Sequence, residues 1–596
     1  RLFKPLAFTK TYAMAASAIL AVTLTPVLMG YFVRGRIRPE SQNPVTRALS
    51  FVYRPVLDAT LKRPVLVLGL SFLVCVTALY PAAKIGSEFM PDLNEGDFLY
   101  MPSAFPGISI GKARELLQQT NKMIKTVPEV ETVHGKAGRA DSATDPAPLT
   151  MIETTIRLKP KDEWRPGMTM DRIRAELDAA VQVPGISNVW IMPIKNRIDM
   201  LATGIKTPLG IKVAGPDLDT ISRIGEDIER ALKPVEGTAS VYSERVVGGR
   251  YVEVDVRREE AARHNMNVGD VQDVIRSAIG GANVSESVEG LERYPINLRF
   301  PRDIRDSVER LRQLPVVTAS GAHVPLQELA DIQIVDGPGM IRSENARLNG
   351  WIYVDIAGRD LGSYVAEARR VVMSEVELPP GYSLGWSGQF QYMERAQERL
   401  SIIVPVTLAL IVVILFMAFR RIAEVAIILL TLPLALAGGV WLLYLLGYNM
   451  SIAVGVGFIA LAGLTVETSL VMLVFLNSAF DEGKEAARAA GRAFKRSDVI
   501  NAVRDGAMLR LRPIIMTDAT VIAGLLPIML GAGTGSEVMR RIAAPMVGGI
   551  ASEMILTLVV LPAVFMLWKF AELRRYETEG AAGGVSPGTH QTSPAE

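Results

Sequence analysis

Seven apolar runs constrain this chain more than any other feature, because each is long enough to cross a lipid bilayer. A spanning helix needs about 20 mostly apolar residues. Several of the runs contain Pro or Gly, which membrane helices tolerate when neighbouring helices satisfy the freed backbone groups. The sequence therefore predicts an α-helical polytopic membrane protein. The runs cover residues 12–33, 64–83, 401–419, 425–446, 452–477, 514–532 and 542–568.

Lys and Arg gather in four of the segments between and after these runs. Such residues mark the cytoplasmic side of a membrane protein. If all seven runs cross, the four basic segments fall on one side, with Arg540 and Arg541 as exceptions on the other. The stretch 84–400 is then predicted to lie outside the cytoplasm. The basic segments 34–63 and 478–513 are expected to include helices on the inner surface.

The stretch 84–400 alternates between strand-like and helix-like segments. Over residues 98–194 the order is strand, helix, strand, strand, helix, strand, which is the ferredoxin-like split βαβ pattern. A second unit of this kind begins at 209–244 and resumes at 351–388, so the residues between are interpreted as an inserted domain with its own strand and helix. The outer part is thus predicted to be a large α/β domain built from ferredoxin-like units.

These patterns divide the chain into predicted regions. The Gly-, Ser-, Pro- and Thr-rich end has too few apolar residues to build a core and is expected to be disordered. The regions are two membrane helices with a basic connection (1–83), a first α/β unit (84–206), the two parts of a second unit (207–250 and 341–400) around an inserted domain (251–340), a five-helix membrane region (401–575) and the tail (576–596).

The composition argues against several classes of protein and of site. A net charge of +2 argues against nucleic acid as the main partner. The single cysteine, Cys75, cannot form an internal disulfide and disfavours a thiolate metal site. Four scattered histidines disfavour a histidine zinc site, whereas methionine is abundant at 24 residues. Thioether sulfur suits Cu(I)-like ions, although methionine also fills gaps in ordinary cores.

Three methionines in the outer stretch stand in suggestive positions. Met151 and Glu153 lie two residues apart in a strand-like run, so their side chains face the same way. Met101 follows the alternating residues 97–100, and Met200 follows residues 196–199. From the residues alone, core packing and soft-metal binding both stay open.

Acidic residues inside the apolar runs are the second candidate site. A carboxylate inside the membrane is costly and is by default a functional hypothesis, often a proton relay. Glu467 lies in the middle of the fifth run and could alternatively be neutral and hydrogen-bonded to Thr465 or Thr468. Asp518, expected near the end of its run, and Glu553 lie on separate runs. With few basic residues nearby in sequence, these acids favour a proton path over structural ion pairs.

Longer strings of residues resemble a known family. They are TYAMAA (11–16), AVTLTPVLM (21–29), NEGDFLYMPS (94–103), NRIDMLATGIK (196–206), GFIALAG (457–463) and GSEVMRRIAAPM (535–546). Over residues 1–570 the chain resembles the heavy-metal efflux branch of the resistance–nodulation–division transporters, and most of all its CusA/SilA-type copper(I)/silver(I) exporters. The resemblance implies twelve spans in two halves. The chain, which begins at Arg1, is interpreted as a C-terminal part holding the sixth to twelfth spans and the second outer loop.

The resemblance also implies a set of metal-handling residues. In this family three methionines of the outer cleft bind Cu(I) or Ag(I), and the matching residues here are Met101, Met151 and Met200. Four residues near that site also match the family: Asp145, Glu153, Arg197 and Lys206. Further methionines form a stepwise relay, and Met14, Met29 and Met539 match members of it. Asn283 replaces a relay methionine in the inserted domain, which alters the last step.

Proton coupling departs from the family pattern. The family's relay glutamate matches Glu467, but its lysine on the next span matches Ile514. Asp518 lies one helical turn beyond Ile514, on the same helix face. Asp518 is therefore predicted to take part in the relay with Glu467.

The resemblance implies a proton-antiport efflux pump subunit, not an enzyme, in the inner membrane of a Gram-negative bacterium. Cu(I) or Ag(I) would be cargo, and no cofactor is expected. Implied partners are two further copies in a homotrimer, a periplasmic membrane-fusion adaptor, an outer-membrane channel and a periplasmic metallochaperone. The inserted domain would be the docking region, and the other two units would form the pore domain.

The sequence fits three other classes of membrane protein less well. A pump for divalent Zn, Co, Cd or Ni would need carboxylates and histidine in its cleft. A drug or lipid exporter, or a protein-translocation component, would need an aromatic cleft, yet residues 97–206 offer only Phe98, Tyr100 and Phe105 as a cluster. A membrane scaffold without transport would not need Glu467.

Overall fold

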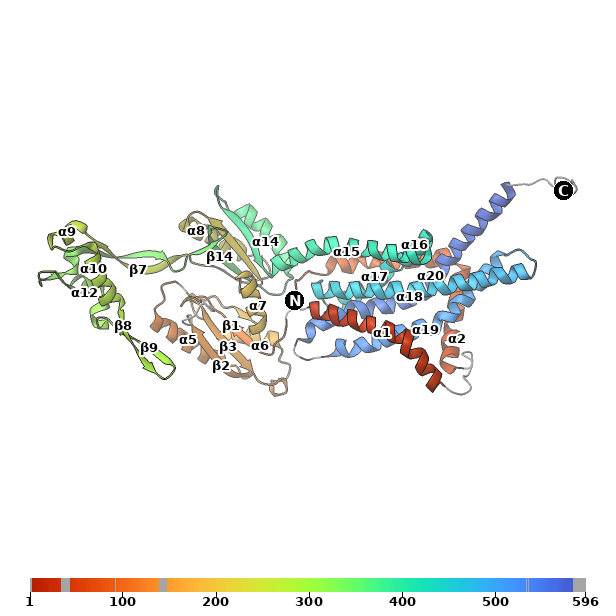
Figure 1. The fold of residues 1–596 in the computed structure, drawn as a ribbon, viewed down its shortest axis with the longest axis horizontal. Coiled ribbons are helices and arrows are strands. Elements are labelled where there is room, and N and C mark those ends of the chain that lie inside the picture. The colour runs from red at the N-terminus through yellow and green to blue at the C-terminus, as the bar shows by residue number, and fades with distance from the viewer. Residues whose placement is uncertain are drawn as a thin grey trace, which may run out of the picture.

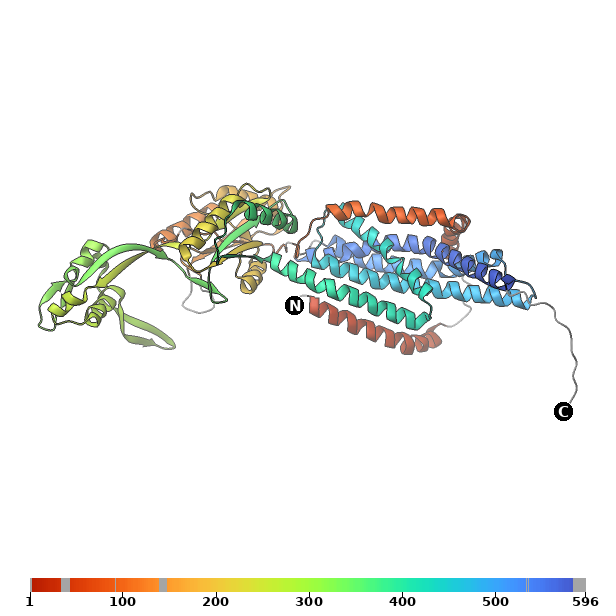
Figure 2. The same cartoon turned by 90° about the horizontal axis from the view of Figure 1, so that it is seen from above.

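The computed structural model describes residues 3–33, 43–91, 93–104, 106–138, 147–531, 533 and 535–582. The described chain is elongated, with long helices side by side at one end and α/β units at the other (Figures 1 and 2). The α/β part is formed by one continuous stretch that lies between the two helical stretches. The helices are formed by the two ends of the chain, and the α/β units by its middle.

Every predicted apolar run is helical. Six helices are long and apolar enough to cross a membrane in the described residues, and a bent pair, Ser536–Ile555 with Thr557–Arg574, brings the number up to seven. The pair is bent by 47° and belongs to a helix with two internal prolines, which kink helices. The helices are α1 (Phe3–Phe32), α3 (Pro64–Thr77) with α4 (Leu79–Lys84), α15 (Gln389–Phe419), α16 (Ile422–Leu429) with α17 (Leu432–Leu445), α18 (Ile452–Ala489), α19 (Arg496–Leu530) and α20 (Ser536–Ala582).

Of the two basic segments expected to hold surface helices, only one contains a separate helix. The first contains a separate helix, α2 (Pro44–Lys62), as expected. Residues 478–513 form no separate surface helix, because α18 runs on to Ala489 and α19 begins at Arg496. The tail also begins later than predicted, because α20 continues to Ala582 through residues with good helix propensity, such as Glu and Ala. Residues 583–596 lie outside the described part.

The main helical core lies between α18, α19 and α20, with α2 and α16 packed against them. Leu476, Val503 and Phe565 are fully buried there, and α2 is tied to it by the hydroxyl of Tyr53, which donates to the Leu558 carbonyl at 2.7 Å. By contrast, every side chain described on α1 is exposed. The helix bundle of this chain therefore buries α18–α20 and leaves α1 without a covered face.

The first α/β unit is an antiparallel sheet with two helices. Its elements are β1 (Phe98–Tyr100), α5 (Ile110–Lys125), β2 (Val130–Ala137), β3 (Ile152–Leu158), α6 (Met170–Ala180) and β4 (Trp190–Ile191), with a short 3-10 turn at Lys161–Glu163. The strand order is β2-β3-β1-β4. Along β3, Ile152 and Ile156 are fully buried while Glu153 faces the other way. The last strand is shorter than predicted, because Pro193 begins an extra helix, α7 (Pro193–Thr203), and proline favours the first turn of a helix.

The second unit repeats the arrangement around the insertion. Its elements are β5 (Leu209–Gly215), α8 (Leu218–Leu232), β6 (Thr238–Ser243), β13 (Arg342–Glu344), β14 (Arg347–Ile356), α14 (Leu361–Glu375) and β15 (Ser383–Gly388). The order is β13-β14-β5-β15, and β6 pairs with the later part of β14. Both helices pack on one face of this sheet, where Ile211 and Val354 of the sheet and Ile228 of α8 are fully buried.

The inserted part stands away from the two units on a long ribbon (Figure 1). The ribbon is β7 (Val247–Val256) paired with β12 (Ala330–Pro338). Beyond it lie α9 (Arg258–Arg263), α10 (Val268–Val274) continuing as a π-helix (Ile275–Gly280), β8 (Ala282–Glu289), β9 (Glu292–Leu298), α11 (Arg302–Arg305), α12 (Val308–Arg312), β10 (Pro315–Val317), β11 (His323–Pro325) and α13 (Leu326–Leu329). The β8–β9 hairpin projects with most of its side chains exposed.

A short strap joins the helices to the outer units. Residues 85–88 follow α4, and the amide of Met450, in the turn between α17 and α18, donates to the Gly86 carbonyl at 2.8 Å. One residue on, the Ser87 amide donates to Asp360 Oδ2 at 2.9 Å, at the start of α14. The α17–α18 turn and the second α/β unit are thus held by consecutive residues of one strap.

Candidate functional site

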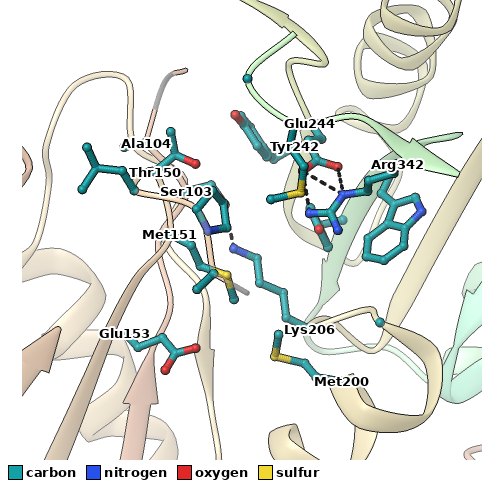
Figure 3. A pocket seen from close by; sticks show the side chains of 18 of the residues that line it. Ser103, Ala104, Thr150, Met151, Glu153, Met200, Lys206, Tyr242, Glu244 and Arg342 are labelled. Atoms are coloured by element: carbon teal, nitrogen blue, oxygen red, sulfur yellow. Dashed lines mark hydrogen bonds and ion pairs between the residues drawn. The ribbon is translucent and has the colours of Figure 1, made fainter. Parts of the chain in front are cut away.

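A cavity of about 560 Å³ lies between the first and second α/β units. Its walls come from the first unit, from α7 and from the second unit (Figure 3). Among the residues that line it are Ser103, Met151, Glu153, Asn196, Arg197, Met200, Lys206, Tyr242, Glu244, Arg342, Trp351 and Tyr353. Segments far apart in the sequence thus meet around one space.

Two predicted metal ligands line this cavity directly. Met151 enters from the start of β3, where it pairs with Ser103, and Met200 enters from α7. Their side chains face the cavity from opposite walls, with Lys206 reaching between them (Figure 3). Glu153 lines the same cavity, so the prediction that Met151 and Glu153 face the same way is confirmed.

Met101 lies behind the cavity wall rather than in it. Its side chain is fully buried, yet its sulfur is 3.0 Å from Asn196 Nδ2. The same nitrogen is 3.2 Å from the sulfur of Met200. The structure therefore brings Met101 and Met200 together around one amide group, with Met151 on the facing wall.

Helix α7 explains this placement. Asn196 and Met200 are four residues apart and so lie on the same helix face. The helix ends at Gly204, whose φ of 76° is left-handed, and a Cβ there would lie 2.5 Å from the Trp351 ring. Glycine is needed at this position for both reasons. A Pro at the start and a Gly just past the end are helix signals, and they would have identified Asn196 as a neighbour of Met200.

Lys206 is the buried cation of the site. Its Nζ donates to Ser103 Oγ at 2.6 Å and to the Met101 carbonyl oxygen at 3.1 Å. It also lies 5.1 Å from the centre of the Tyr353 ring. Burial disfavours the charged ammonium and lowers the pKa of Lys206 to about 8, although the carboxylates of Glu244 and Glu153 oppose this shift. Sequence patterns alone did not identify Ser103 or Tyr353 as neighbours of Lys206.

The carboxylates at the cavity are already paired. Glu153 Oε2 is 2.9 Å from Lys136 Nζ, and Glu244 Oε1 is 2.9 Å from Arg342 Nη2. Among the described residues, no group of three or more His, Cys, Asp and Glu side chains is arranged to hold a metal ion. The site therefore offers thioethers, and not free carboxylates, to a cation.

The aromatic rings at the cavity were not expected from residues 97–206, because they belong to the second unit. Tyr242, Trp351 and Tyr353 line the cavity. Arg342 lies 4.2 Å from the centre of the Trp351 ring, so that ring face is covered by a cation. Lys206 covers Tyr353 in the same way. The rings therefore act as partners for these cations more than as an open apolar surface.

Other predicted metal-handling residues lie apart from the cavity or outside the described chain. Arg197 is exposed and lines the cavity, whereas Asp145 falls outside the described residues. The relay candidates Met14, Met29 and Met539 are 61%, 57% and 40% exposed. Asn283, on the projecting hairpin, accepts a hydrogen bond from Asn297 Nδ2 at 2.9 Å.

The predicted proton-relay acids lie in two different environments. Glu467 is exposed on α18. In the described part of the chain Thr465 Oγ1 has no hydrogen-bond partner, and Thr468 Oγ1 donates to the Leu464 carbonyl at 3.1 Å rather than to Glu467. Asp518 is fully buried and lies in the interior of α19, away from both ends of the helix. The predicted apolar run began at Ile514, whereas α19 begins already at Arg496, so Asp518 was placed too close to an end.

Asp518 interacts with an acid on another helix, Glu553 on α20. The two carboxyl groups interact electrostatically, and Glu553 Oε1 accepts a hydrogen bond from Thr557 Oγ1 at 2.9 Å. Neither oxygen of Asp518 has a hydrogen-bond partner in the described part of the chain. Ile514 is buried in the apolar core one turn away. The structure thus groups Asp518 with Glu553 and places Glu467 on an exposed surface.

Comparison with known proteins gives a consistent result. The family model described as the AcrB/AcrD/AcrF family matches residues 1–569. The cation efflux system protein CusA of Escherichia coli (strain K12) is 50% identical over 95% of this chain and 54% of its own length. The putative cation efflux system protein SilA of Salmonella typhimurium is 50% identical over 97% of the chain and 55% of its own length.

More distant relatives include proteins named for other metals. The cobalt-zinc-cadmium resistance protein CzcA of Cupriavidus metallidurans (strain ATCC 43123 / DSM 2839 / NBRC 102507 / CH34) is 34% identical over 95% of the chain and 53% of its own length. A crystal structure of a heavy metal efflux pump matches with a TM-score of 0.80 and 32% identity over 89% of this chain and 53% of that one. The chain spans about half the length of the curated relatives it matches.

Proposed function

We propose that this chain, which belongs to the AcrB/AcrD/AcrF family, is part of an efflux pump that exports the monovalent soft ions Cu(I) or Ag(I). The observation that carries the proposal is the placement of two methionines on one cavity and of a third just behind its wall. Met151 and Met200 line it, and Met101 shares the Asn196 amide with Met200. Thioethers are soft ligands that select Cu(I)-like ions. Relatives named as cation efflux proteins support this assignment.

A pump for divalent metals is the second candidate, because a relative is named for cobalt, zinc and cadmium. The donor set argues against it. Zn²⁺ sites use Cys, His and carboxylate ligands, and the two cavity carboxylates nearest the methionines are each paired with a cation. Identity to that relative is also lower, 34% against 50%.

The architecture that we infer is that of a membrane pump half. It comprises seven membrane helices and two ferredoxin-like split βαβ units in the periplasm, separated by the insertion. The first sheet runs β2-β3-β1-β4, and the second runs β6-β14-β5-β15 with β13 as an extra strand that also pairs with β14; this shared order supports the assignment. The protein would lie in a bacterial inner membrane.

The partners that we infer are two further copies of the chain, a periplasmic membrane-fusion adaptor, an outer-membrane channel and a metallochaperone. The exposed α1 supports a partner for the membrane helices, since all its described side chains lack cover in this chain. The projecting β8–β9 hairpin, with Leu291 at 99% exposure, supports docking by the inserted part.

We further propose that transport is driven by protons carried by acids of the membrane helices, with Glu467 as the carrier at the exposed surface. Asp518 and Glu553 would act as a buried second pair. Met14, Met29 and Met539 would pass metal to the cavity together with methionines of other segments, since all three are exposed here. Asp145, Glu153, Arg197 and Lys206 would tune the electrostatics of the metal site.

Metal titration of the purified, detergent-solubilised protein tests the proposal. We expect Ag(I) to bind at one tight site per chain and Zn(II) to fail to compete for it. Zn(II) binding as tight as Ag(I) at that site would instead favour the divalent-metal pump.

A further inference from the structure

Asn196 lies between two of the predicted metal ligands. Its Nδ2 is 3.0 Å from the Met101 sulfur and 3.2 Å from the Met200 sulfur. The residue is 5% exposed and lines the cavity. This is a polar contact between a buried amide and two thioethers that neither family membership nor the predicted ligand set explains.

The amide can face the sulfurs in only one way. An amide NH₂ has two hydrogens to donate, and a thioether sulfur is only an acceptor. One hydrogen is available for each sulfur, so the donor capacity of Asn196 is fully used by Met101 and Met200. If the amide turned over, its carbonyl oxygen would face two electron-rich sulfurs. The sulfurs therefore dictate the orientation of the amide.

This orientation leaves the other end of the amide unsatisfied. Asn196 Oδ1 is buried and has no hydrogen-bond partner anywhere in the described chain. A buried carbonyl oxygen without a partner is destabilising. One end of the amide is thus bonded to the two sulfurs, and the other end is left unpaired.

A bound cation would favour the opposite orientation of the Asn196 amide, with its oxygen toward the sulfurs. The two N–H groups present partial positive charge where a thioether-bound cation would sit, so they hold the sulfurs together in the cation's absence. Ligands that already converge lose less freedom when the ion binds. Once the ion is present it repels the NH₂ group and attracts the carbonyl oxygen, which then gains a partner.

We propose that Asn196 is the positioning residue of the soft-metal site. Its amide holds the thioethers of Met101 and Met200 together while the site is empty, and it turns its oxygen toward the cation when the site is loaded. This inference rests on the proposed function, because it takes Met101 and Met200 as ligands of a monovalent soft cation. A purely structural asparagine would make the same contacts but would not respond to metal.

Methionine-methyl NMR of the purified protein tests the empty state. The protein is labelled with ¹³C-methyl methionine, and the two signals are assigned with Met101→Leu and Met200→Leu. We expect both signals to shift and broaden in Asn196→Leu and in Asn196→Asp, since neither variant has a donor for the sulfurs. Unchanged signals in both variants would overturn the tether.

Ag(I) titration of the same variants tests the loaded state. Asn196→Leu should bind Ag(I) about tenfold more weakly, because it loses both the converging sulfurs and the oxygen. Asn196→Asp keeps an oxygen for the cation and should bind more tightly than Asn196→Leu. Asn188→Leu is the matched control: its amide donates to Asp178 Oδ1 and to the Val181 carbonyl, not to sulfur, so Ag(I) affinity should stay that of the unmodified protein.

The outcomes separate this inference from the proposed function. If the unmodified protein fails to bind Ag(I), the proposed function is wrong, and the NMR comparison still decides whether Asn196 holds the sulfurs. If the unmodified protein binds Ag(I) and Asn196→Leu binds it equally well, the proposed function stands and the role of Asn196 is refuted. Equal affinity of the Leu and Asp variants would refute the turning of the oxygen toward the cation.

Discussion

Lys206 donates a hydrogen bond from its Nζ to the backbone carbonyl oxygen of Met101, 3.1 Å away. A buried ammonium group is therefore fixed against the main chain of a predicted metal ligand. Its other direct contacts, Ser103 Oγ and the Tyr353 ring, are uncharged, and the carboxylates of Glu244 and Glu153 only partly offset its burial. Burial of this cation therefore has a cost that depends on pH.

The first prediction concerns stability and Lys206. Its pKa falls from 10.5 in the unfolded chain to about 8 in the folded protein. Below pH 8 the ammonium is charged in both states, and its burial cost is present in full. Between pH 8 and 10.5 the unfolded chain binds more protons, so the free energy of unfolding should rise with pH. The rise attributable to Lys206 is at most about 3 kcal/mol.

Thermal unfolding between pH 7 and 10.5 checks this prediction in comparison with Lys206→Met. The variant should be relatively more stable at pH 7 and should lack that part of the rise. Lys112→Met, whose side chain is 60% exposed, serves as the control and should keep the original profile. Parallel profiles for the unmodified protein and Lys206→Met would show that Lys206 does not titrate in this range.

The second prediction concerns Met151. Replacement by Ile removes the thioether and keeps an apolar side chain that strands accommodate well. We expect Met151→Ile to fold normally and to weaken Ag(I) binding by about tenfold or more, which is about 1.4 kcal/mol or more of binding free energy. Isothermal titration measures the change. Met373→Ile, at a position that is 83% exposed on α14, should leave binding unchanged; unaltered affinity in Met151→Ile would remove Met151 from the ligand set.

The third prediction concerns the side of the membrane on which residues 84–400 lie. Leu291, at the tip of the β8–β9 hairpin, is 99% exposed. After Cys75 is replaced by Ala, Leu291→Cys should react with a membrane-impermeant thiol reagent in intact cells whose outer membrane is permeabilised. Labelling that requires lysis of the inner membrane would place the hairpin in the cytoplasm and reverse the predicted topology.

The sequence predicted the elements whose patterns are long and regular. Apolar runs of bilayer length gave the membrane helices, and the alternation around Ile152 and Ile156 gave β3 with Glu153 on the opposite face. The short helix α7 was missed, because the predicted strand was continued past Pro193 to residue 194 and the residues after it were given no helix. That one error hid the relation between Asn196 and Met200, which depends on helical spacing.

Sequence patterns could not predict contacts between segments that are far apart in the chain. Lys206 meets Tyr353 and Glu244 only because the second unit closes over the first, and no local periodicity encodes that approach. The same holds for Asp518, which was predicted to act together with Glu467. The packing of α19 against α20 brings Glu553 there instead.

The last prediction separates the acids of the membrane helices. Glu467 faces outward, whereas Asp518 and Glu553 form one buried group that interacts electrostatically. In proteoliposomes containing the complete pump, Glu467→Gln should abolish metal-driven proton flux. Asp518→Asn and Glu553→Gln should each reduce the flux, and the double variant should be no worse than the more severe single one, because groups that act as a unit are not additive.

Thermal stability gives a second test of the buried acids Asp518 and Glu553, independent of proton flux. A buried acid without hydrogen-bond partners is costly, so Asp518→Leu should raise the temperature of thermal unfolding even as it lowers proton flux. Glu482→Gln, at an exposed position near the end of α18, is the control and should change neither property. Normal flux in Asp518→Leu and Glu553→Gln, with Glu467→Gln inactive, would leave Glu467 as the carrier and reduce the buried pair to a structural feature. Full flux in Glu467→Gln would move the carrier role elsewhere in the pump.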